Sequence, residues 1–351
     1  MTPASDRAAD PLARYSRQVL FEPIGPDRQR RLMAGRATLI GCGALGTVIA
    51  DVLVRAGVGF LRLIDRDLIE LNNLQRQVLY DEQDLAEGLP KAAAAAAKLR
   101  RINAQVTVEP HVVDVNRTNV ESLIDGADVV LDGTDNFETR FLVNDAAVKR
   151  RVPWIYGACI GATGLVLPIV PHETPCLRCI WTDPPPPGSS PTCDTAGVLA
   201  TTVHVVAALQ ALEAIKLLAG QATALNRRLQ QLDVWRGRFD TLDVQAARSA
   251  DCRCCGQGQY DWLNGAAGGG SATLCGRNAV QVSGAAGRLD LAQLAERVAR
   301  VVDGPPRLNR YMLRFSVGGR EFAVFADGRA IIQGTSDVDE ARTAYAKYVG
   351  A

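Results

Sequence analysis

The first part of the chain alternates between short apolar runs, which predict buried strands, and longer segments with helical spacing or many alanines. The runs 37–40 and 60–64 flank a glycine turn and a predicted helix over 47–56. This is a βαβ unit of about 30 residues, the unit from which parallel sheets are built. Further strands are predicted at 106–113, 129–132, 154–156, 164–170 and 229–234, and helices at 14–34, 91–101, 141–149, 197–219 and from 120.

The pattern changes after residues 259–273, which contain the run GAAGGGS and have the composition of a flexible linker. Beyond it, two apolar runs flank Gly318-Gly319, which predicts a β-hairpin. The chain is therefore predicted to be α/β, with a Rossmann-like, mostly parallel sheet and flanking helices over 14–258. A flexible tail over 1–13 would precede this domain, and a small α+β accessory domain over 274–351 would follow the linker. Within it, strands are expected at 279–282, 311–317, 321–325 and 330–333, and helices at 289–302 and 337–348.

Composition and charge exclude several classes of protein. Hydrophobic residues make up 47% of the 351 and charged residues 22%, which is ordinary for a globular chain. Lys and Arg number 39 against 38 Asp and Glu, so no overall field favours nucleic acid or an acidic membrane. The apolar stretch 197–220 is interrupted by polar residues, and the N-terminus lacks the apolar core of a secretory signal. We expect a cytoplasmic protein without nucleic-acid or membrane partners.

The residues between the first strand and the first helix of the βαβ unit read GCGALG, a G-x-G-x-x-G turn over 41–46. Glycines let such a turn approach phosphate groups, whose charge is favoured at the helix N-terminus. Asp65 ends the next strand, where an acid binds a ribose hydroxyl. We interpret this unit as a nucleotide site. NAD is one candidate ligand, and a tight turn without any ligand is the alternative.

Residues that follow the unit favour a nucleoside triphosphate over NAD. Arg76 and Lys91 supply cations, and Asp135 comes directly after the fourth predicted strand. NAD carries only two phosphate charges, whereas a triphosphate with Mg²⁺ needs several cations and an acid for the metal. The sequence therefore predicts an ATP site with Mg²⁺.

In this order, the motifs RYSRQ, GCGALG, NNLQRQ, GTDN and PCLRC resemble those of the ThiF/MoeB/HesA family over residues 14–256. The resemblance implies MgATP-dependent adenylation of the C-terminal glycine of a small ubiquitin-like sulfur carrier that ends in Gly-Gly. ThiS and MoaD are such carriers, so thiamine and molybdopterin biosynthesis are the implied pathways. A carrier of a specialised thio-metabolite pathway, or a non-catalytic nucleotide-binding partner protein of the same fold, remains an alternative.

The resemblance also assigns roles to individual residues. Arg17 would reach into the ATP site of a partner subunit, which implies a homodimer. Asp65 would bind the ribose and Asp135 the Mg²⁺ ion. The other residues implied to bind the nucleotide are Gly41, Gly43, Ala44 and Gly46 in the turn, Asn73, Arg76 and Lys91 at the phosphates, and Asn136 beside the metal acid.

Two Cys-x-x-Cys pairs predict a metal site. Cys176 with Cys179 and Cys252 with Cys255 supply four thiolates, the ligand set of tetrahedral Zn²⁺ without an open position. The predicted zinc is therefore structural, and a redox pair or unligated thiols is the alternative. Cys254 lies inside the second pair, but its spacing does not fit.

Cys193 lies between a proline-rich run and the long helix. In the family this segment crosses the active site, and the resemblance implies a thiol that accepts sulfur or an acyl group; a loop cysteine without chemistry is the alternative. Cys42 and Cys159 are predicted to be packing residues. No catalytic set is visible after the linker, so we expect a carrier-docking or dimer-stabilising module there.

Overall fold

The computed structural model describes residues 10–185, 193–266, 273–274, 278–282 and 289–350. The chain divides into two compact units, Met1–Ala267 and Gly268–Ala351, and each is described by itself. The predicted tail and proline-rich loop lie mostly, and the predicted linker partly, outside the described residues.

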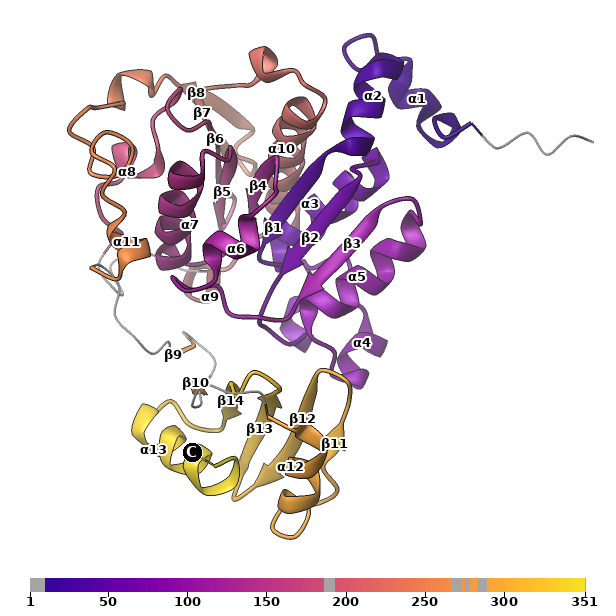
Figure 1. The fold of residues 1–351 in the computed structure, drawn as a ribbon, viewed down its shortest axis with the longest axis vertical. Helices are drawn as coiled ribbons and strands as arrows, with labels where there is room; N and C mark the ends of the chain where they lie inside the picture. Colours follow the sequence, from indigo (N-terminus) through magenta and orange to yellow (C-terminus); the bar gives the residue numbers. More distant parts are fainter. Residues whose placement is uncertain (1–9, 186–192, 267–272, 275–277, 283–288, 351) are drawn as a thin grey trace, which may run out of the picture. The chain divides into compact units, whose positions relative to one another are not determined.

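The first unit is built on an eight-stranded sheet with the order β3-β2-β1-β4-β5-β6-β7-β8 (Figure 1). The first five strands run parallel and the last three antiparallel, which confirms the predicted mostly parallel α/β fold. All seven strands predicted here are present. The strands are β1 Arg36–Ile40, β2 Phe60–Ile64, β3 Thr107–His111, β4 Val129–Asp132, β5 Trp154–Ile160, β6 Thr163–Ile169, β7 Leu229–Asp233 and β8 Arg238–Leu242.

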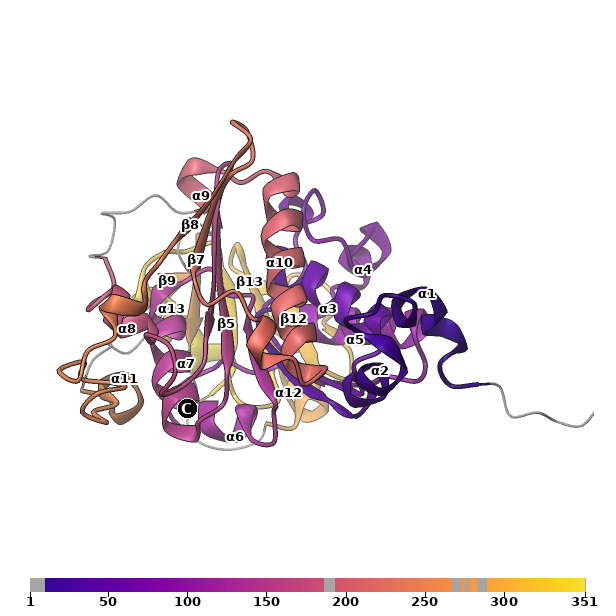
Figure 2. The same cartoon turned by 90° about the horizontal axis from the view of Figure 1, so that it is seen from above.

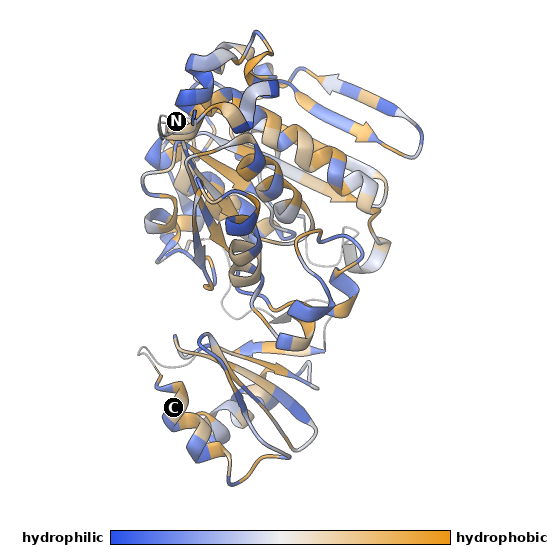
Figure 3. Cartoon of the chain, turned by 90° about the vertical axis from the view of Figure 1, so that its right-hand side faces the viewer, coloured by the Kyte–Doolittle hydropathy of each residue, from blue (hydrophilic) through white to orange (hydrophobic). Residues whose placement is uncertain are grey.

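Helices cover both faces of this sheet (Figures 1 and 2). Apolar side chains of α3, α5 and α10 form one core, and those of α6, α7, α8 and α11 form a second core on the other face. Colouring by hydropathy shows apolar residues on the strands and on the helix faces packed against them (Figure 3). The helices are α1 Ser16–Val19, α2 Gly25–Ala34, α3 Ala44–Ala56, α4 Glu82–Glu87, α5 Lys91–Ile102, α6 Val120–Ile124, α7 Phe137–Arg150, α8 Leu177–Ile180, α9 Cys193–Ala196, α10 Ala200–Leu218 and α11 Asp261–Asn264, with 3-10 turns η1 Ala13–Tyr15, η2 Leu71–Asn73, η3 Ala222–Ala224 and η4 Gln245–Ala247.

Two predicted helix boundaries are wrong and one strand was missed, each for an identifiable reason. The single helix predicted over 14–34 is interrupted between α1 and α2, where Gly25 has φ +57° and Pro23 precedes it. Helix α7 begins four residues earlier than predicted, because the side chain of Asn136 caps it. Strand β8 was not predicted because all five of its residues are exposed, so no alternation marks it.

Helix α10 is long and apolar enough to cross a membrane by length and composition. In the structure it packs against α3 and against strands β5 and β6. Its residues Val203, Val206 and Ala207 are fully buried in the first core. It is therefore a core helix, as predicted.

The second unit contains a six-stranded sheet with the order β11-β12-β13-β14-β10-β9 and has its own hydrophobic core. The predicted hairpin is present between β12 and β13, and both glycines of its turn have positive φ, as a two-residue turn of this kind requires. The elements are β9 Thr273–Leu274, β10 Ala279–Val282, α12 Leu291–Val298, β11 Arg307–Leu308, β12 Met312–Val317, β13 Arg320–Phe325, β14 Ala330–Gln333 and α13 Val338–Tyr348.

The turn between β1 and α3 packs backbone against backbone. Gly41 has φ +91°, and a Cβ on it would lie 2.5 Å from the carbonyl oxygen of Gly133, the residue that follows β4. A Cβ on Gly46 would lie 2.0 Å from the carbonyl oxygen of Gly41. These contacts explain why glycine is required at both positions, independently of any ligand.

We expect Gly46→Ala to lower the free energy of unfolding by about 3 kcal/mol or more, because the backbone of Gly41 must move to make room for the Cβ. Gly161→Ala is the matched control: no atom lies within 4 Å of its Cβ position, but its φ is +58°. That variant should lose only about 1 kcal/mol through backbone strain. Urea denaturation measures both values, and equal losses would contradict the packing argument.

Candidate active site

The carboxyl ends of β1 and β4 meet where the strand order reverses, which is where open α/β sheets bind ligands. Helix α3 begins there at Ala44, directly after the turn, and α7 begins there at Phe137, just beyond β4. The backbone nitrogen of Lys91, the first residue of α5, donates to the carbonyl of Asp67, just beyond β2. Three helix N-termini therefore lie along this edge, and their partial positive charges favour an anion.

Asp65 is held next to the glycine turn. One of its carboxylate oxygens accepts from the backbone nitrogen of Cys42 at 2.6 Å, and the other from the backbone nitrogen of Asp67 at 2.6 Å. Burial raises the pKa of Asp65, while the charge of Lys91 opposes that shift. The Asp65 carboxylate is thus fixed beside the glycine turn, as the sequence analysis predicted.

Lys91 is the most buried cation of the predicted set, with only 3% of its surface exposed. Its Nζ lies 3.0 Å from Oδ2 of Asp67. A cation at a helix N-terminus is electrostatically unfavourable, so Asp67 stabilises Lys91 there. The sequence analysis missed Asp67; the signal was a second acid two residues after Asp65, directly beyond the strand.

Asn73 and Arg76 lie in the segment that leads from β2 toward α5. Asn73 is 1% exposed, and its amide donates to Oδ1 of Asn72 at 2.7 Å. Arg76 donates to the backbone carbonyl of Asn72 at 2.7 Å. The hydroxyl of Tyr80 lies 2.8 Å from the carbonyl oxygen of Cys42, so this segment is tied to the glycine turn.

The loop that carries Asp135 is fixed by a buried ion pair. Arg140 donates from Nε to Oδ2 of Asp132 at 2.9 Å and from Nη2 to the carbonyl of Thr134 at 2.7 Å. The other oxygen of Asp132 accepts from the backbone and hydroxyl of Thr134 at 2.9 and 2.7 Å. Burial lowers the pKa of Arg140, but the charges of Asp132, Tyr156 and Asp135 and the hydrogen bond to Asp132 together raise it, so the net pKa lies above its ordinary value.

Asp135 itself is exposed at the end of this loop, with no ion pair among the described residues. Its neighbour Asn136 accepts from the backbone nitrogen of Thr139 at 2.8 Å and so caps α7. The sequence analysis missed Asp132 and Arg140, because their roles appear only when α7 folds back over the end of β4.

Arg17 is exposed on α1 at the opposite edge of the sheet. A Cβ on Gly57, which ends α3, would lie 2.5 Å from the ring of Tyr15, so this N-terminal segment lies by the far end of α3. The 13 residues of α3 span about 20 Å. Within one chain, the structure does not bring Arg17 to the site.

Cys193 is the first residue of α9, and its side chain lies outside the described residues. The chain that follows α9 is anchored beyond β5: the backbone nitrogen of Gly161 donates to the carbonyl of Gly197 at 2.9 Å. The segment therefore reaches the same edge of the sheet as the glycine turn.

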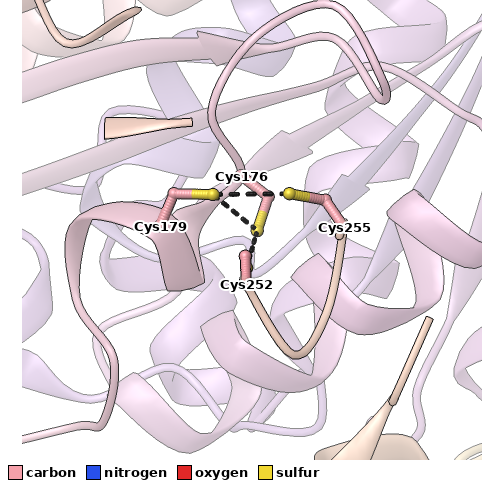
Figure 4. A group of neighbouring side chains, drawn as sticks. All are labelled: Cys176, Cys179, Cys252 and Cys255. Carbon is pink, nitrogen blue, oxygen red and sulfur yellow. Dashed lines mark hydrogen bonds between the residues drawn. The ribbon is translucent and has the colours of Figure 1, made fainter. Parts of the chain in front are cut away.

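The four predicted metal ligands come together (Figure 4). Their Sγ atoms all lie within 4.8 Å of one another, with separations of 3.7 Å for Cys176–Cys252, 3.9 Å for Cys176–Cys179 and 3.3 Å for Cys179–Cys255. Ligands in a tetrahedron around Zn²⁺ with Zn–S bonds of about 2.3 Å are about 3.8 Å apart. The cysteine cluster therefore fits a closed metal site that leaves no position for a substrate.

Helix α7 holds both halves of the cysteine cluster together. Asn144, which is fully buried, accepts from the backbone nitrogen of Leu177 at 2.8 Å and donates to Sγ of Cys254 at 3.3 Å. Cys254 thus packs beside the cluster. Asp261 also connects the segments of the two Cys-x-x-Cys pairs, since it accepts from Arg178 in the first at 3.0 Å and from Arg253 in the second at 2.8 Å.

The fold and this site are those of a nucleotide-binding α/β protein. Comparison with known proteins shows which family of this class the chain belongs to. The sequence matches the ThiF family over residues 15–254, so the chain belongs to the ThiF family. It is 43% identical over 338 residues to the sulfur carrier protein ThiS adenylyltransferase of Bacillus subtilis, which covers 96% of this chain and 99% of that protein. The expected family resemblance is confirmed.

Two further proteins are similar to this chain. The SAMP-activating enzyme E1 of Haloferax volcanii is 40% identical over 253 residues, 72% of this chain and 92% of that protein. A crystal structure of E. coli MccB with ATP superposes with a TM-score of 0.59 at 25% identity, covering 69% of this chain and 74% of that chain. The family match ends at residue 254, whereas the B. subtilis protein also matches the second unit.

The purified protein should contain one zinc ion per chain, and Cys255→Ser should release it and lower the melting temperature. Zinc binding at such sites contributes directly to folding free energy. Cys254→Ser is the matched control, since the hydroxyl of the introduced serine can still accept from Asn144 and all four predicted ligands are kept. Metal analysis and thermal unfolding check both variants; zinc-free wild type, or zinc lost from the control alone, would contradict the assignment.

Proposed function

We propose that this chain adenylates the C-terminal glycine carboxylate of a small ubiquitin-like sulfur-carrier protein, using MgATP and releasing pyrophosphate. The observation that carries the proposal is the row of fixed charges at the switch point of the sheet. Asp65 is held at the glycine turn, Lys91 is buried beside Asp67, and Asp135 is exposed on a rigid loop. Membership in a family with a full-length relative of this activity supports it.

The reaction needs positioning and charge stabilisation more than proton transfer. A terminal carboxylate has a pKa of about 3.5 and is already ionised near neutral pH, so no general base is required. The carboxylate attacks the α-phosphorus, and the bond to pyrophosphate breaks. Lys91, Arg76 and Asn73 would hold the phosphates, and the helix N-termini at this edge would stabilise the charge that moves onto the leaving group.

Two metal ions complete the proposal. Asp135 is exposed at the carboxyl edge and would bind Mg²⁺ on the triphosphate. Asn136, beside it, caps α7 and so helps to fix the loop. Zn²⁺ would occupy the cysteine cluster as a structural ion. Asp65 would bind the ribose, and the turn 41–46 would contact the phosphates through its backbone.

We further propose that the carrier is of the ThiS type. The B. subtilis relative is named for ThiS and matches over 338 residues, so it shares the second unit that lies beyond the family match. The second unit would dock the carrier or stabilise a dimer. A MoaD-type carrier in molybdopterin biosynthesis, a carrier of a specialised thio-metabolite pathway and a non-catalytic nucleotide-binding role are the alternatives. A cytoplasmic site of action fits the substrate ATP.

We also propose a homodimer. Arg17 is exposed at the end of the sheet opposite the site, so if it serves an ATP site, that site belongs to another subunit. A sulfur- or acyl-accepting role for Cys193 stays a prediction. Its segment reaches the correct edge, where an activated carboxyl group would lie.

The function is tested by ATP–pyrophosphate exchange with purified ThiS-type and MoaD-type carriers. We expect exchange with the ThiS-type carrier. Asp135→Asn should lower the exchange rate at least about 100-fold, because the carboxylate would hold the Mg²⁺ ion that stabilises charge on the phosphates. Glu138→Gln, an exposed acid on the first turn of α7, should stay within twofold of wild type. No exchange with any carrier would refute adenylation, and exchange with MoaD alone would refute the carrier assignment.

Arg17→Ala should be inactive as a homodimer and recover part of the activity when mixed with Asp135→Asn subunits. Each mixed dimer would contain one site in which both residues are intact. Native mass spectrometry must show that the subunits have exchanged. Mixed dimers without any recovered activity would show that Arg17 does not act across a subunit boundary.

A further inference from the structure

One edge of the sheet in the second unit carries three arginines that the fold leaves unpaired. Arg307 lies on the edge strand β11, Arg310 lies in the turn that follows it, and Arg314 lies on β12 (Figure 1). Arg307 and Arg310 are exposed and Arg314 is half-buried. None of the three side chains forms an ion pair or a hydrogen bond with a residue that the structure describes. We call these three residues the basic edge.

The acids on the neighbouring strands and loops do not neutralise the basic edge. Glu321 is opposite Ser316, two residues along β12 from Arg314, and within the described structure it forms no ion pair with Arg314. Asp303 is used elsewhere, since it accepts from the backbone nitrogen of Gly318 at 3.0 Å, beyond the far end of β12. The charge of the basic edge is therefore available to a partner.

The strand register brings two of these charges together. Arg307 is directly opposite Arg314 in the antiparallel pair of β11 and β12, so both side chains leave the same face of the sheet. Directly opposite Cβ atoms are about 5 Å apart, and like charges there destabilise strand pairing. A charge on an edge strand can protect it from pairing with another sheet, but one charge of either sign is enough for that. Two opposed arginines require another explanation.

The turn between the two strands holds the basic edge in a fixed shape. Oδ1 of Asn309 accepts from the backbone nitrogens of Tyr311 and Met312 at 2.9 and 3.0 Å. The backbone nitrogen of Asn309 donates to the carbonyl of Met312 at 3.0 Å. The guanidinium of Arg310 lies 4.5 Å from the centre of the Tyr311 ring, a contact that orients it without using its N–H donors. These donors therefore stay free for an anionic partner.

We propose that the basic edge docks an acidic face of the carrier protein; this inference rests on the proposed function. A guanidinium binds a carboxylate through paired, charge-assisted hydrogen bonds, so carboxylates on a folded partner fit these fixed arginines. The edge lies in a unit beyond the family match, which ends at residue 254. Docking there would add affinity for the carrier without changing the nucleotide site.

The surroundings of the basic edge favour a protein over a nucleic acid. Leu308, next to Arg307 on β11, is 47% exposed, and Val301, just beyond α12, is 55% exposed. Helix α12 packs beside β11, so these apolar side chains belong to the same edge of the unit. Arginines next to exposed apolar side chains are typical of protein interfaces, whereas a phosphate backbone would leave the apolar side chains without a partner.

Three variants separate docking from a purely structural role. The double variant Arg307→Gln with Arg314→Gln removes both opposed charges, so its melting temperature should stay unchanged or rise. Arg307→Glu keeps a charge on the edge strand and still protects it, but repels an acidic partner. Arg342→Gln is the matched control, because Arg342 is an exposed arginine on α13, away from this edge.

The experiment is ATP–pyrophosphate exchange by the full chain with the purified ThiS-type carrier at several salt concentrations. We expect the KM for the carrier to rise about tenfold or more in the double variant and in Arg307→Glu, the range for a lost charge-assisted hydrogen bond. The KM for ATP should stay within twofold of wild type, as should kcat. The KM of wild type for the carrier should rise with salt, and that of the double variant should rise less. The control should match wild type throughout.

A KM for the carrier within twofold of wild type in both variants would overturn the inference. With that KM unchanged, a loss of dimer in native mass spectrometry would instead assign the basic edge to a contact between copies of this chain. Loss of binding to a mixed RNA pool would likewise assign it to nucleic acid. Wild type that exchanges with no carrier would refute the proposed function, and this inference with it, so the two failures are distinguishable.

Discussion

The direct backbone contact between the glycine turn and the residue after β4 is the constraint on which this structure depends. No side chain separates Gly41 from Gly133, and a Cβ on either would overlap backbone atoms of the other's turn. This closeness brings the N-terminus of α3 and the Asp135 loop to the same point at the carboxyl edge. The glycine turn, Asp65 and the Asp135 loop, all proposed to bind the nucleotide, lie beside that contact.

Two buried cations around this contact are paired with acids of the same chain. Lys91 is buried against Asp67, and Arg140 is buried against Asp132. An unpaired buried charge would destabilise the folded state. Pairing each cation with an acid lets both be buried and fixes their positions. Such fixed charges need little rearrangement when a triphosphate arrives, which is the requirement for catalysis by charge stabilisation.

Helix α7 links the candidate site to the cysteine cluster. Its first turn is capped by Asn136 beside Asp135, and two turns later Asn144 contacts Leu177 and Cys254. A metal in the cysteine cluster would therefore stabilise the same helix that orients the Asp135 loop, although it lies away from the nucleotide. One helix therefore connects the cysteine cluster to the loop that carries Asp135.

The sequence by itself determined the parallel sheet, the glycine turn and the four cysteines that cluster, because these follow from local periodicity and short spacings such as 41–46 and 252–255. It also predicted Asp65, Lys91 and Asp135 as residues of a nucleotide site, and their roles there stay predictions. Only the tertiary structure revealed Asp67 and Arg140, whose contacts depend on which strand ends and loops fold together. It also placed Arg17 at the far edge, because that distance is set by the length and packing of α3. Contacts between elements distant in sequence leave no periodic signal, so they become visible only once the chain is folded.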